Sequence, residues 1–192
     1  MISIIVAISQ DNAIGKQGNL LCHMSADLKH FKEITMGHPI LMGKNTWLSL
    51  PRRPLPGRRN IVVTHHPTAN GLEGAETVGS IDEAISSVDT HEECFVIGGG
   101  MIYEQCLPKA DKLYITEIHA TFPDADTFFP TINPTEWELI EEERFEADEK
   151  KYGLFSNANK AAKLQAKADV ALYEANKYKY KYEKRKAAES KD

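Results

Sequence analysis

Short apolar runs alternate with helix-like segments along most of the chain. Runs with strand character lie at 2–8, 39–42, 60–64, 94–97 and 112–118. Some of them, such as Ile61-Val62-Val63, do not alternate apolar with polar residues, which is typical of strands covered on both faces. Strands that alternate with helices indicate an α/β fold with a doubly wound, mostly parallel central sheet flanked by helices.

Helices are predicted between these strands. Ser25 is the expected N-cap of one helix, with Leu28, Phe31 and Ile34 on one face. Ser80 and Glu83 have the spacing of a capping box at the start of another. Two further helical segments, 44–50 and 101–107, each directly follow glycine, and the Pro-rich stretch 51–57 is expected to form a loop.

The pattern changes after residue 150. Residues 156–176 are rich in Ala and Lys and predict a helix with a thin apolar stripe. Tyr and Lys then alternate over 178–182, which predicts an antiparallel C-terminal edge strand with one aromatic and one solvated face. We expect one domain over 1–186, with 151–176 as an inserted helical segment and 187–192 as a frayed end.

Composition narrows the class of protein. The three cysteines are odd in number without metal-type spacing, and the histidines form no HExxH motif, so we predict no metal site and a reduced, cytoplasmic protein. The apolar start is too short to span a bilayer and lacks the basic region of a signal peptide. Residues 1–149 carry 11 Lys/Arg against 23 Asp/Glu, whereas residues 150–192 carry 12 against 5, so an acidic body precedes a basic end.

Two glycine turns are candidates for binding phosphate. Gly98-Gly99-Gly100 joins a strand to a helix, and so does Gly43, which Lys44 and Thr46 follow. Backbone without Cβ atoms lets a ligand approach closely, and a helix N-terminus favours anions. Either turn alone also fits a purely structural role, but two such turns in one parallel sheet favour a dinucleotide.

Two charged residues are candidates for the substrate. Asp27 lies in the first turn of its helix beside Leu28 and Phe31. It either complements the helix dipole or grips a cationic or amidine-like heterocycle. Arg58 follows a rigid Pro-Gly loop and is either a surface charge or a bidentate clamp for a carboxylate.

The order and spacing of several segments resemble bacterial dihydrofolate reductases. The segments are Ile2–Gly15, Ala26–Lys32, Ile40–Trp47, Pro54–Asn60, Val96–Tyr103 and Leu113–Thr116. The similarity runs from residue 1 to about 150 and returns at the Tyr-rich strand. It implies NADPH-dependent reduction of 7,8-dihydrofolate to tetrahydrofolate, and makes antifolates expected inhibitors.

The resemblance also implies roles for individual residues. Asp27 would bind the 2-amino group and N3 of the pterin, and the Thr116 hydroxyl would orient Asp27. The substrate pocket would be lined by Ile5, Val6, Leu28, Phe31, Leu50 and Ile97, with Arg58 on the glutamate α-carboxylate. The cofactor would be surrounded by Ala7, Ile14, Gly43, Lys44, Asn45, Thr46, Thr64, His65, Gly98, Gly99, Gly100, Met101, Ile102 and Tyr103. The Gly98–Gly99 peptide would be cis, and residues 11–24 would form a loop that closes over the nicotinamide.

Three features depart from the family pattern. Cys22 stands where Trp is usual, either as a tolerated replacement or as a change that alters folate and antifolate binding. Thr64-His65-His66 and Met101 replace the usual basic residues near the adenosine 2′-phosphate, so the preference for NADPH should be smaller and sensitive to pH. About 25 residues, the predicted helix 151–176, replace a short turn, which costs little closure entropy.

Several alternatives stay open at this point. The insertion is an inert excursion, a contact to the acidic body or a second subunit, or a weak site for an acidic partner such as nucleic acid. We expect a monomer, with a dimer through the inserted helix as the alternative, and no membrane partner. A related reductase of riboflavin synthesis shares the sheet and the glycine turn, and a catalytically impaired pterin- or NADPH-binding protein is the third reading.

Overall fold

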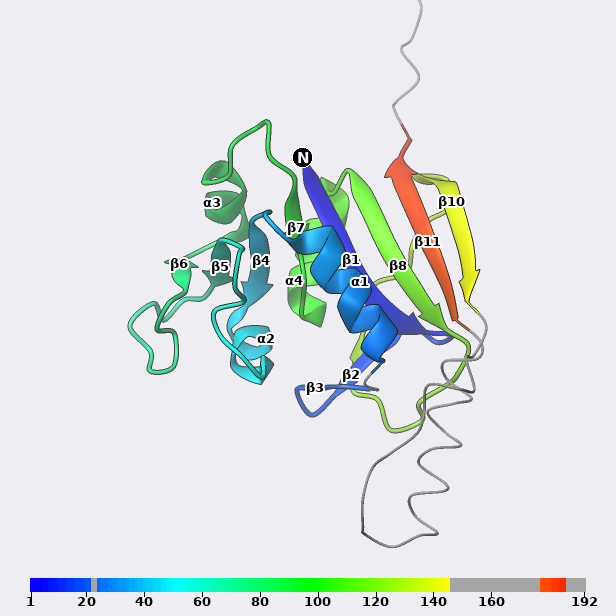
Figure 1. Ribbon diagram of the computed structural model, residues 1–192, viewed down its shortest axis with the longest axis horizontal. Coiled ribbons are helices and arrows are strands. Elements are labelled where there is room, and N and C mark those ends of the chain that lie inside the picture. The colour runs from blue at the N-terminus through cyan, green and yellow to red at the C-terminus, as the bar shows by residue number, and fades with distance from the viewer. Residues whose placement is uncertain (22–23, 146–176, 186–192) are drawn as a thin grey trace, which may run out of the picture.

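An eight-stranded mixed sheet forms the centre of the molecule (Figure 1). The computed structural model describes residues 1–21, 24–145 and 177–185. The strand order is β10-β11-β8-β1-β7-β4-β5-β6. These strands span β1 Ile2–Ser9, β4 Ile40–Gly43, β5 Asn60–Val63, β6 Glu76–Val78, β7 Cys94–Val96, β8 Lys112–Ile118, β10 Trp137–Phe145 and β11 Lys177–Lys184.

The parallel part of the sheet confirms the predicted fold class. All neighbours from β8 to β6 pair parallel, and β11 runs antiparallel to β8. The five predicted strands are present with small shifts at their ends, whereas β6 was not predicted because three partly exposed residues leave almost no pattern. The C-terminal strand is not the edge strand, because β10 pairs with its other side.

Two helices cover each face of the sheet (Figure 1). Helices α1 (Ser25–Thr35) and α2 (Lys44–Ser49) lie on one face. Helices α3 (Ile81–Ser86) and α4 (Gly100–Cys106) lie on the other, and α4 continues into the 3₁₀ helix η1 (Leu107–Lys109).

The helix starts differ in detail from the predictions. The N-cap of α1 is Met24, with no side-chain hydrogen bond, so Ser25 is the first helical residue rather than the cap. Ser80 caps α3 as predicted, since its hydroxyl accepts the N–H of Glu83. The Glu83 carboxylate accepts the N–H of Gly79 instead of that of Ser80, so the capping box is shifted by one residue.

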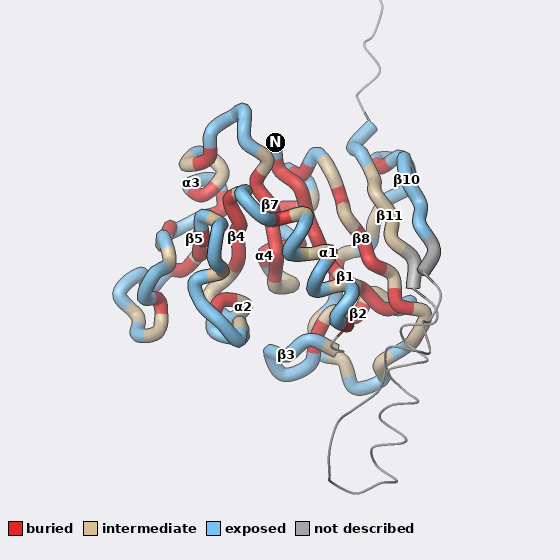
Figure 2. Tube along the Cα trace, viewed as in Figure 1, coloured by how far each residue is buried: buried red, intermediate tan, exposed pale blue. Residues whose placement is uncertain are grey.

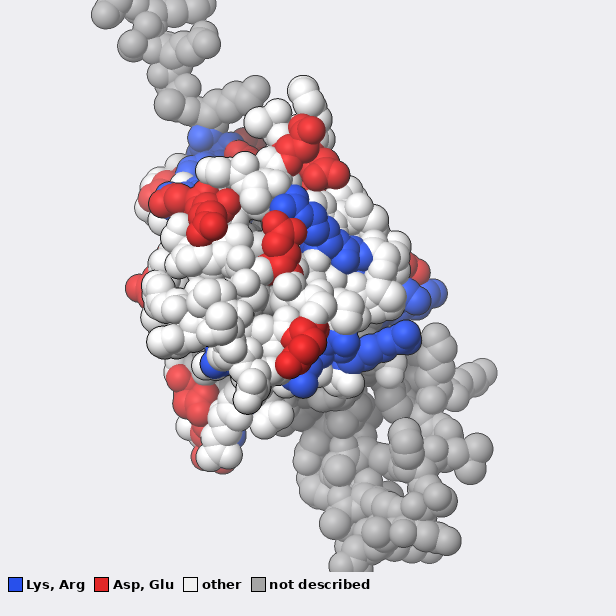
Figure 3. Space-filling view, turned by 90° about the vertical axis from the view of Figure 1, so that its left-hand side faces the viewer, with Lys and Arg blue, Asp and Glu red and all other residues white. Residues whose placement is uncertain are grey.

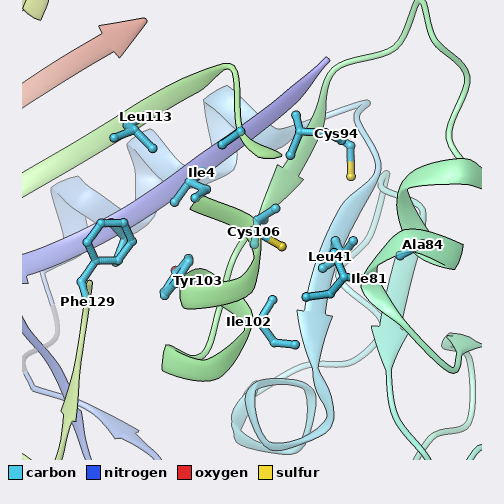
Figure 4. Packing of buried hydrophobic residues seen from close by; sticks show 14 of the residues in the cluster. Ile4, Leu41, Ile81, Ala84, Cys94, Ile102, Tyr103, Cys106, Leu113 and Phe129 are labelled. Atoms are coloured by element: carbon cyan, nitrogen blue, oxygen red, sulfur yellow. The ribbon is translucent and has the colours of Figure 1, made fainter. Parts of the chain in front are cut away.

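The central strands are largely buried (Figure 2), and their side chains form two cores, one on each face of the sheet. The larger core packs α3 and α4 against the sheet and contains Ile4, Leu113 and Phe129 (Figure 4). The smaller core packs α1 and α2 against Ile5 and Phe95. Alternate residues of one strand therefore serve opposite cores, as the two-residue repeat of a strand requires.

Both faces of strand β11 are at least partly covered. Tyr180 and Tyr182 pack on the larger core, as expected for the aromatic face. Lys179 and Lys181 lie on the other face and are only half-exposed, so the predicted solvated face is partly covered.

A second sheet of three short strands lies near the sheet's carboxyl end, in the order β3 (Asn19–Leu20), β2 (Ala13–Lys16) and β9 (Thr127–Phe128). These strands were not predicted, because each has two to four residues and their pairing joins segments more than a hundred residues apart. The sheet ties the loop after β1 to the segment before Phe129.

The remaining sequence predictions concern the surface and the residues that the structure does not describe. The predicted inserted helix 151–176 lies outside the described residues, and the single-domain assignment stays a prediction. In the described part of the chain, no helix is long and apolar enough to cross a membrane. The face shown in Figure 3 mixes acidic and basic side chains over a mostly uncharged surface, so it offers no extended basic patch to an acidic partner.

Candidate active site

The two glycine turns meet at the carboxyl end of the parallel strands. The main-chain N–H of Gly43, at the end of β4, donates to the carbonyl oxygen of Gly98, after β7 (2.8 Å). A methyl group on Gly43 would lie 3.0 Å from Cγ1 of Ile102, and one on Gly99 would lie 3.3 Å from Oγ1 of Thr46. Absence of side chains at these positions therefore lets the turns and their helices pack together.

Gly98 has the most constrained backbone of this group. Its φ is +118°, and the peptide bond to Gly99 is cis, as the family resemblance implied. A methyl group on Gly98 would lie 3.2 Å from Cε2 of Tyr103. The Tyr103 hydroxyl donates to the carbonyl oxygen of Ile5 (2.9 Å), so this ring forms a fixed wall between β1 and the triple-glycine turn.

The charge of Asp27 affects the pKa of Tyr103. Burial raises the pKa of Tyr103, and the nearby charge of Asp27 raises it further. The phenol is therefore neutral throughout the physiological range and acts as a hydrogen-bond donor. The Tyr103 ring also packs edge-on against Phe129, with the two ring centres 5.2 Å apart (Figure 4).

The starts of α2 and α4 fit a pyrophosphate. Gly43 and Gly99 are their N-caps, and neither start has a side-chain hydrogen bond. Main-chain N–H groups in the first turn of a helix have no intrahelical acceptor and attract anions. Lys44 is the first residue of α2 and is half-buried, so an ammonium group stands at the same place. These residues fit a dinucleotide cofactor.

Asp27 is held against strand β8. It is the third residue of α1, and Oδ1 accepts the hydroxyl hydrogen of Thr116 (2.7 Å). Thr116 is buried on β8, with its partner Ala7 on β1. A half-buried carboxylate that is fixed by a buried hydroxyl can present its remaining oxygen lone pairs to a ligand.

Four of the six residues predicted to line the substrate pocket belong to or pack against the smaller core. Phe31 and Leu50 pack at the edge of the smaller core, which contains Ile5 and Ile97. The side chain of Val6 belongs to the larger core on the other face, so Val6 can offer the substrate only its main chain. Leu28 is 44% exposed and lies outside both cores, where an incoming ligand would cover it.

Arg58 is positioned by the far end of α1. The Thr35 hydroxyl donates to the carbonyl oxygen of Phe31 (2.7 Å) and accepts Nη1–H of Arg58 (3.0 Å). The guanidinium carbon lies 5.7 Å from the centre of the Phe31 ring. Burial lowers the pKa of Arg58 somewhat, but an arginine stays charged at neutral pH. The cation therefore lies on the same helix face as Asp27.

The loop that follows β1 is anchored on β9. The main-chain N–H of Gln17 donates to Oδ2 of Asp126 (2.7 Å), and the N–H of Asp126 donates to the carbonyl oxygen of Gly15 (3.2 Å). Lys16 adds an exposed ion pair with Asp124 (2.9 Å). Asp124, Asp126, Lys16 and Gln17 are exposed, whereas Gly15 is buried.

The adenosine end is less defined than the glycine turns. Thr64 is buried, and its hydroxyl oxygen accepts the N–H of His66 (3.1 Å), whereas His65 is exposed. Asn45 is exposed, and Met101 is 75% exposed. Ala7 and Ile14, which were predicted to lie near the nicotinamide, are half-buried. Cys22 lies outside the described residues, and within them no group of three or more His, Cys, Asp or Glu could hold a metal ion.

Known proteins share this arrangement. The family model for dihydrofolate reductase matches residues 1–160. The chain belongs to the dihydrofolate reductase family. It is 43% identical over 150 residues to dihydrofolate reductase type 3 of Salmonella typhimurium, covering 78% of this chain and 91% of that protein. The dihydrofolate reductase of Bacillus subtilis is also 43% identical over 150 residues, covering 78% and 88%.

A solved structure extends the likeness to the fold. The dihydrofolate reductase of Enterococcus faecalis, in a complex with NADP(H) and RAB-propyl, matches with a TM-score of 0.75 and 29% identity, and 97% of each chain is covered. The central sheet and its helices are therefore those of the dihydrofolate reductase family.

Two residues of this family member escaped the sequence analysis. The Thr35 hydroxyl holds the Arg58 guanidinium, and the Asp126 carboxylate anchors the loop after β1. Each of these contacts joins residues that are distant in sequence. The only local signal for Thr35 was its place in the same helix as Phe31, and Asp126 offered none.

Proposed function

We propose that this dihydrofolate reductase family member reduces 7,8-dihydrofolate to 5,6,7,8-tetrahydrofolate by hydride transfer to C6 and protonation at N5. The observation that carries the proposal is the Thr116–Asp27 hydrogen bond, which fixes a carboxylate across the cleft from the glycine turns. NADPH, when bound, supplies the hydride. The protein must orient two rings, exclude water and favour a proton at N5.

Asp27 supplies the orientation of the pterin. Its carboxylate pairs with the 2-amino group and N3, while Thr116 keeps the carboxylate in one rotamer. A carboxylate so engaged is not within reach of N5 as well, so a water molecule delivers the N5 proton. Asp27 therefore acts by binding and polarising the ring rather than by touching the reacting carbon.

The other end of the substrate is bound through charge. The Arg58 guanidinium pairs with the glutamate α-carboxylate, and the Thr35 hydroxyl and the Phe31 ring hold that guanidinium in place. Ile5, Phe31, Leu50 and Ile97 contact the rings between the two charged ends. Because Asp27 is part of α1 and Arg58 is held by Thr35 of the same helix, α1 sets the distance between the two ends of the bound substrate.

The cofactor is bound by main chain on the other side of the cleft. The N-termini of α2 and α4, with Lys44 and Thr46, hold the pyrophosphate, and Gly98, Gly99 and Ala7 lie near the nicotinamide. The loop 11–24 closes over the nicotinamide and excludes water. Thr64, His65 and Met101 border the adenosine. Because they stand where basic residues are usual, the preference for NADPH over NADH is smaller.

Two finer points belong to the same proposal. Antifolates that carry a protonated diaminopyrimidine compete for Asp27, because they present the same pair of donors. The enzyme works as a cytoplasmic monomer, which agrees with the free buried thiols of Cys94 and Cys106.

Steady oxidation of NADPH on adding dihydrofolate, followed by absorbance, tests this function. We expect turnover that stops on adding an antifolate. The Asp27→Asn variant, prepared in the same way, serves as the control. Binding of both ligands without an absorbance change would overturn the proposal in favour of a binding protein. Turnover only with a pyrimidine intermediate of riboflavin synthesis would do so in favour of the related reductase.

A further inference from the structure

A second cavity, of about 210 Å³, lies on the other side of α1 from the candidate active site. It is bounded by His30 and Ile34 of α1, by Tyr114 of β8 and by strands β10 and β11. None of its lining residues belongs to the substrate or cofactor sets described above. The two α1 residues that line it, His30 and Ile34, lie on the same helix as Asp27 and Phe31 of the candidate site.

The strand side of this cavity is charged, with two exposed glutamates and two half-exposed lysines. Lys179 and Lys181 of β11 line it, and their register partners Glu143 and Glu141 of β10 line it too. A sheet face beneath a helix is normally apolar, because buried charges lose their hydration. Helix α1 accordingly buries only Thr35 completely, and the space beneath it stays open.

The charges and the Tyr114 ring line the same cavity. The ammonium nitrogen of Lys181 lies 5.6 Å from the centre of the Tyr114 ring. Burial lowers the pKa of His30, and the charge of Lys179 lowers it further, while Asp27, Glu143 and Glu33 act in the opposite direction. The imidazole is therefore an uncharged wall at neutral pH, beside two ammonium groups and two carboxylates.

We propose that this cavity is a second ligand site and that it takes a small zwitterion with a single aromatic ring. The carboxylate of the ligand pairs with Lys179 and Lys181, its ammonium group pairs with Glu141 and Glu143, and its ring packs between Ile34 and Tyr114. Equal numbers of both charges favour a zwitterion over a simple anion or cation. The volume lies below the roughly 300–1,000 Å³ of drug-sized pockets, which limits the ligand to one ring.

A ligand bound in this cavity would change substrate binding in the active site. His30 is one helical turn beyond Asp27, and Thr116, which holds Asp27, is the register partner of Lys179. A ligand wedged against His30 and Ile34 shifts α1 relative to β8, and so changes the KM for dihydrofolate. This consequence rests on the proposed function, whereas the binding itself does not.

Calorimetric titration of the full-length protein with L-phenylalanine tests the site. We expect saturable binding at millimolar concentration that persists in excess dihydrofolate. The analogues 3-phenylpropionate and phenethylamine each lack one charge and should bind about tenfold more weakly, the effect of one lost charge-assisted contact. Glu143→Gln and Lys181→Met should each weaken L-phenylalanine binding by about the same factor.

The matched control is Asp82→Asn, which removes one charge from the exposed Lys109–Asp82 pair and should leave the affinity unchanged. Three results would overturn the proposal: no saturable binding, loss of binding in excess dihydrofolate, or equal binding of L-phenylalanine and 3-phenylpropionate. Failure of dihydrofolate turnover with intact L-phenylalanine binding would reject the proposed function and leave the second site standing.

Discussion

The proposed substrate side of the active site and its proposed cofactor side are built from different parts of the chain. On the substrate side, the contacts come from side chains on α1 and its surroundings, with Asp27 fixed by Thr116 and Arg58 fixed by Thr35. On the cofactor side, they come from the main chain at two glycine turns that hydrogen-bond each other.

This difference determines what a substitution can do. A side chain on the substrate side can be replaced while the fold stays intact, so its loss should appear in kinetics. A glycine on the cofactor side supports both the backbone shape and the ligand, so its loss should appear in stability as well. Four substitutions test this division.

The largest effect is expected from Asp27→Asn. The amide is isosteric and keeps the Thr116 contact, but it carries no charge for the pterin, so turnover at neutral pH should fall by about a hundredfold or more. Steady-state NADPH oxidation measures the loss, and cofactor affinity by fluorescence titration should not change. Turnover equal to that of the wild type would remove Asp27 from the mechanism.

Gly98→Ala should reduce stability and cofactor affinity together. The positive φ and the Tyr103 ring 3.2 Å from the added methyl group should cost about 1–3 kcal/mol in the free energy of unfolding. Urea unfolding measures this cost. Gly37→Ala is the matched control, because its φ is +83° but nothing lies within 4 Å of the added methyl group. Equal losses at both sites would show that the Tyr103 contact adds nothing.

Thr35→Val should raise the KM for dihydrofolate about tenfold with kcat nearly unchanged, the signature of lost binding that is equal in ground and transition states. The variant frees Arg58 from its hydroxyl acceptor, while Thr35→Ser retains the hydroxyl and should behave like the wild type. A substrate truncated before its glutamate should not distinguish the three proteins. A fall in kcat without a change in KM would contradict the positioning of Arg58.

The smallest effect is expected at the loop anchor, in Asp126→Asn. The N–H of Gln17, followed by the Thr127 hydroxyl, lowers the pKa of Asp126 from its ordinary value of 3.8. A depressed pKa means that the anchoring is complete above that value and is lost as the pH falls through the lower, folded-state pKa. Turnover of the variant should therefore drop a few-fold, by a ratio that stays constant between about pH 5 and pH 8.

Asp124→Asn is the control for the loop. Its ion pair with Lys16 is exposed, with 45% and 80% of the two side chains accessible, and such pairs contribute little. A loss equal to that of Asp126→Asn, or a ratio that changes with pH in the neutral range, would contradict the assigned anchor.

The parts of this structure that the sequence could predict are those that depend on local sequence patterns. The parallel strands are apolar runs, and the glycine turns stand directly between a strand and a helix, so neighbours in sequence were sufficient. The Asp27–Thr116 contact followed from family resemblance alone, because the two residues are 89 positions apart.

Non-local packing explains what could not be predicted. Arg58 meets Thr35 across 23 positions, and Gln17 meets Asp126 across 109. The face to which Val6 points was hidden as well, because a strand that is apolar on both sides gives no alternation from which to assign its faces. The lysines of β11 looked solvated for the same kind of reason, since the sequence does not reveal that α1 lies over them.

The position of β11 inside the sheet has a consequence for synthesis on the ribosome. Residues up to 145 can emerge and form the parallel strands, but β8 then has an unpaired edge and β10 has no neighbour to join. The strand that closes this gap leaves the exit tunnel after all the other described strands. We therefore expect nascent chains stalled before residue 177 to be recognised by chaperones and to lack ligand-binding capacity, although every residue assigned to the active site has already been made.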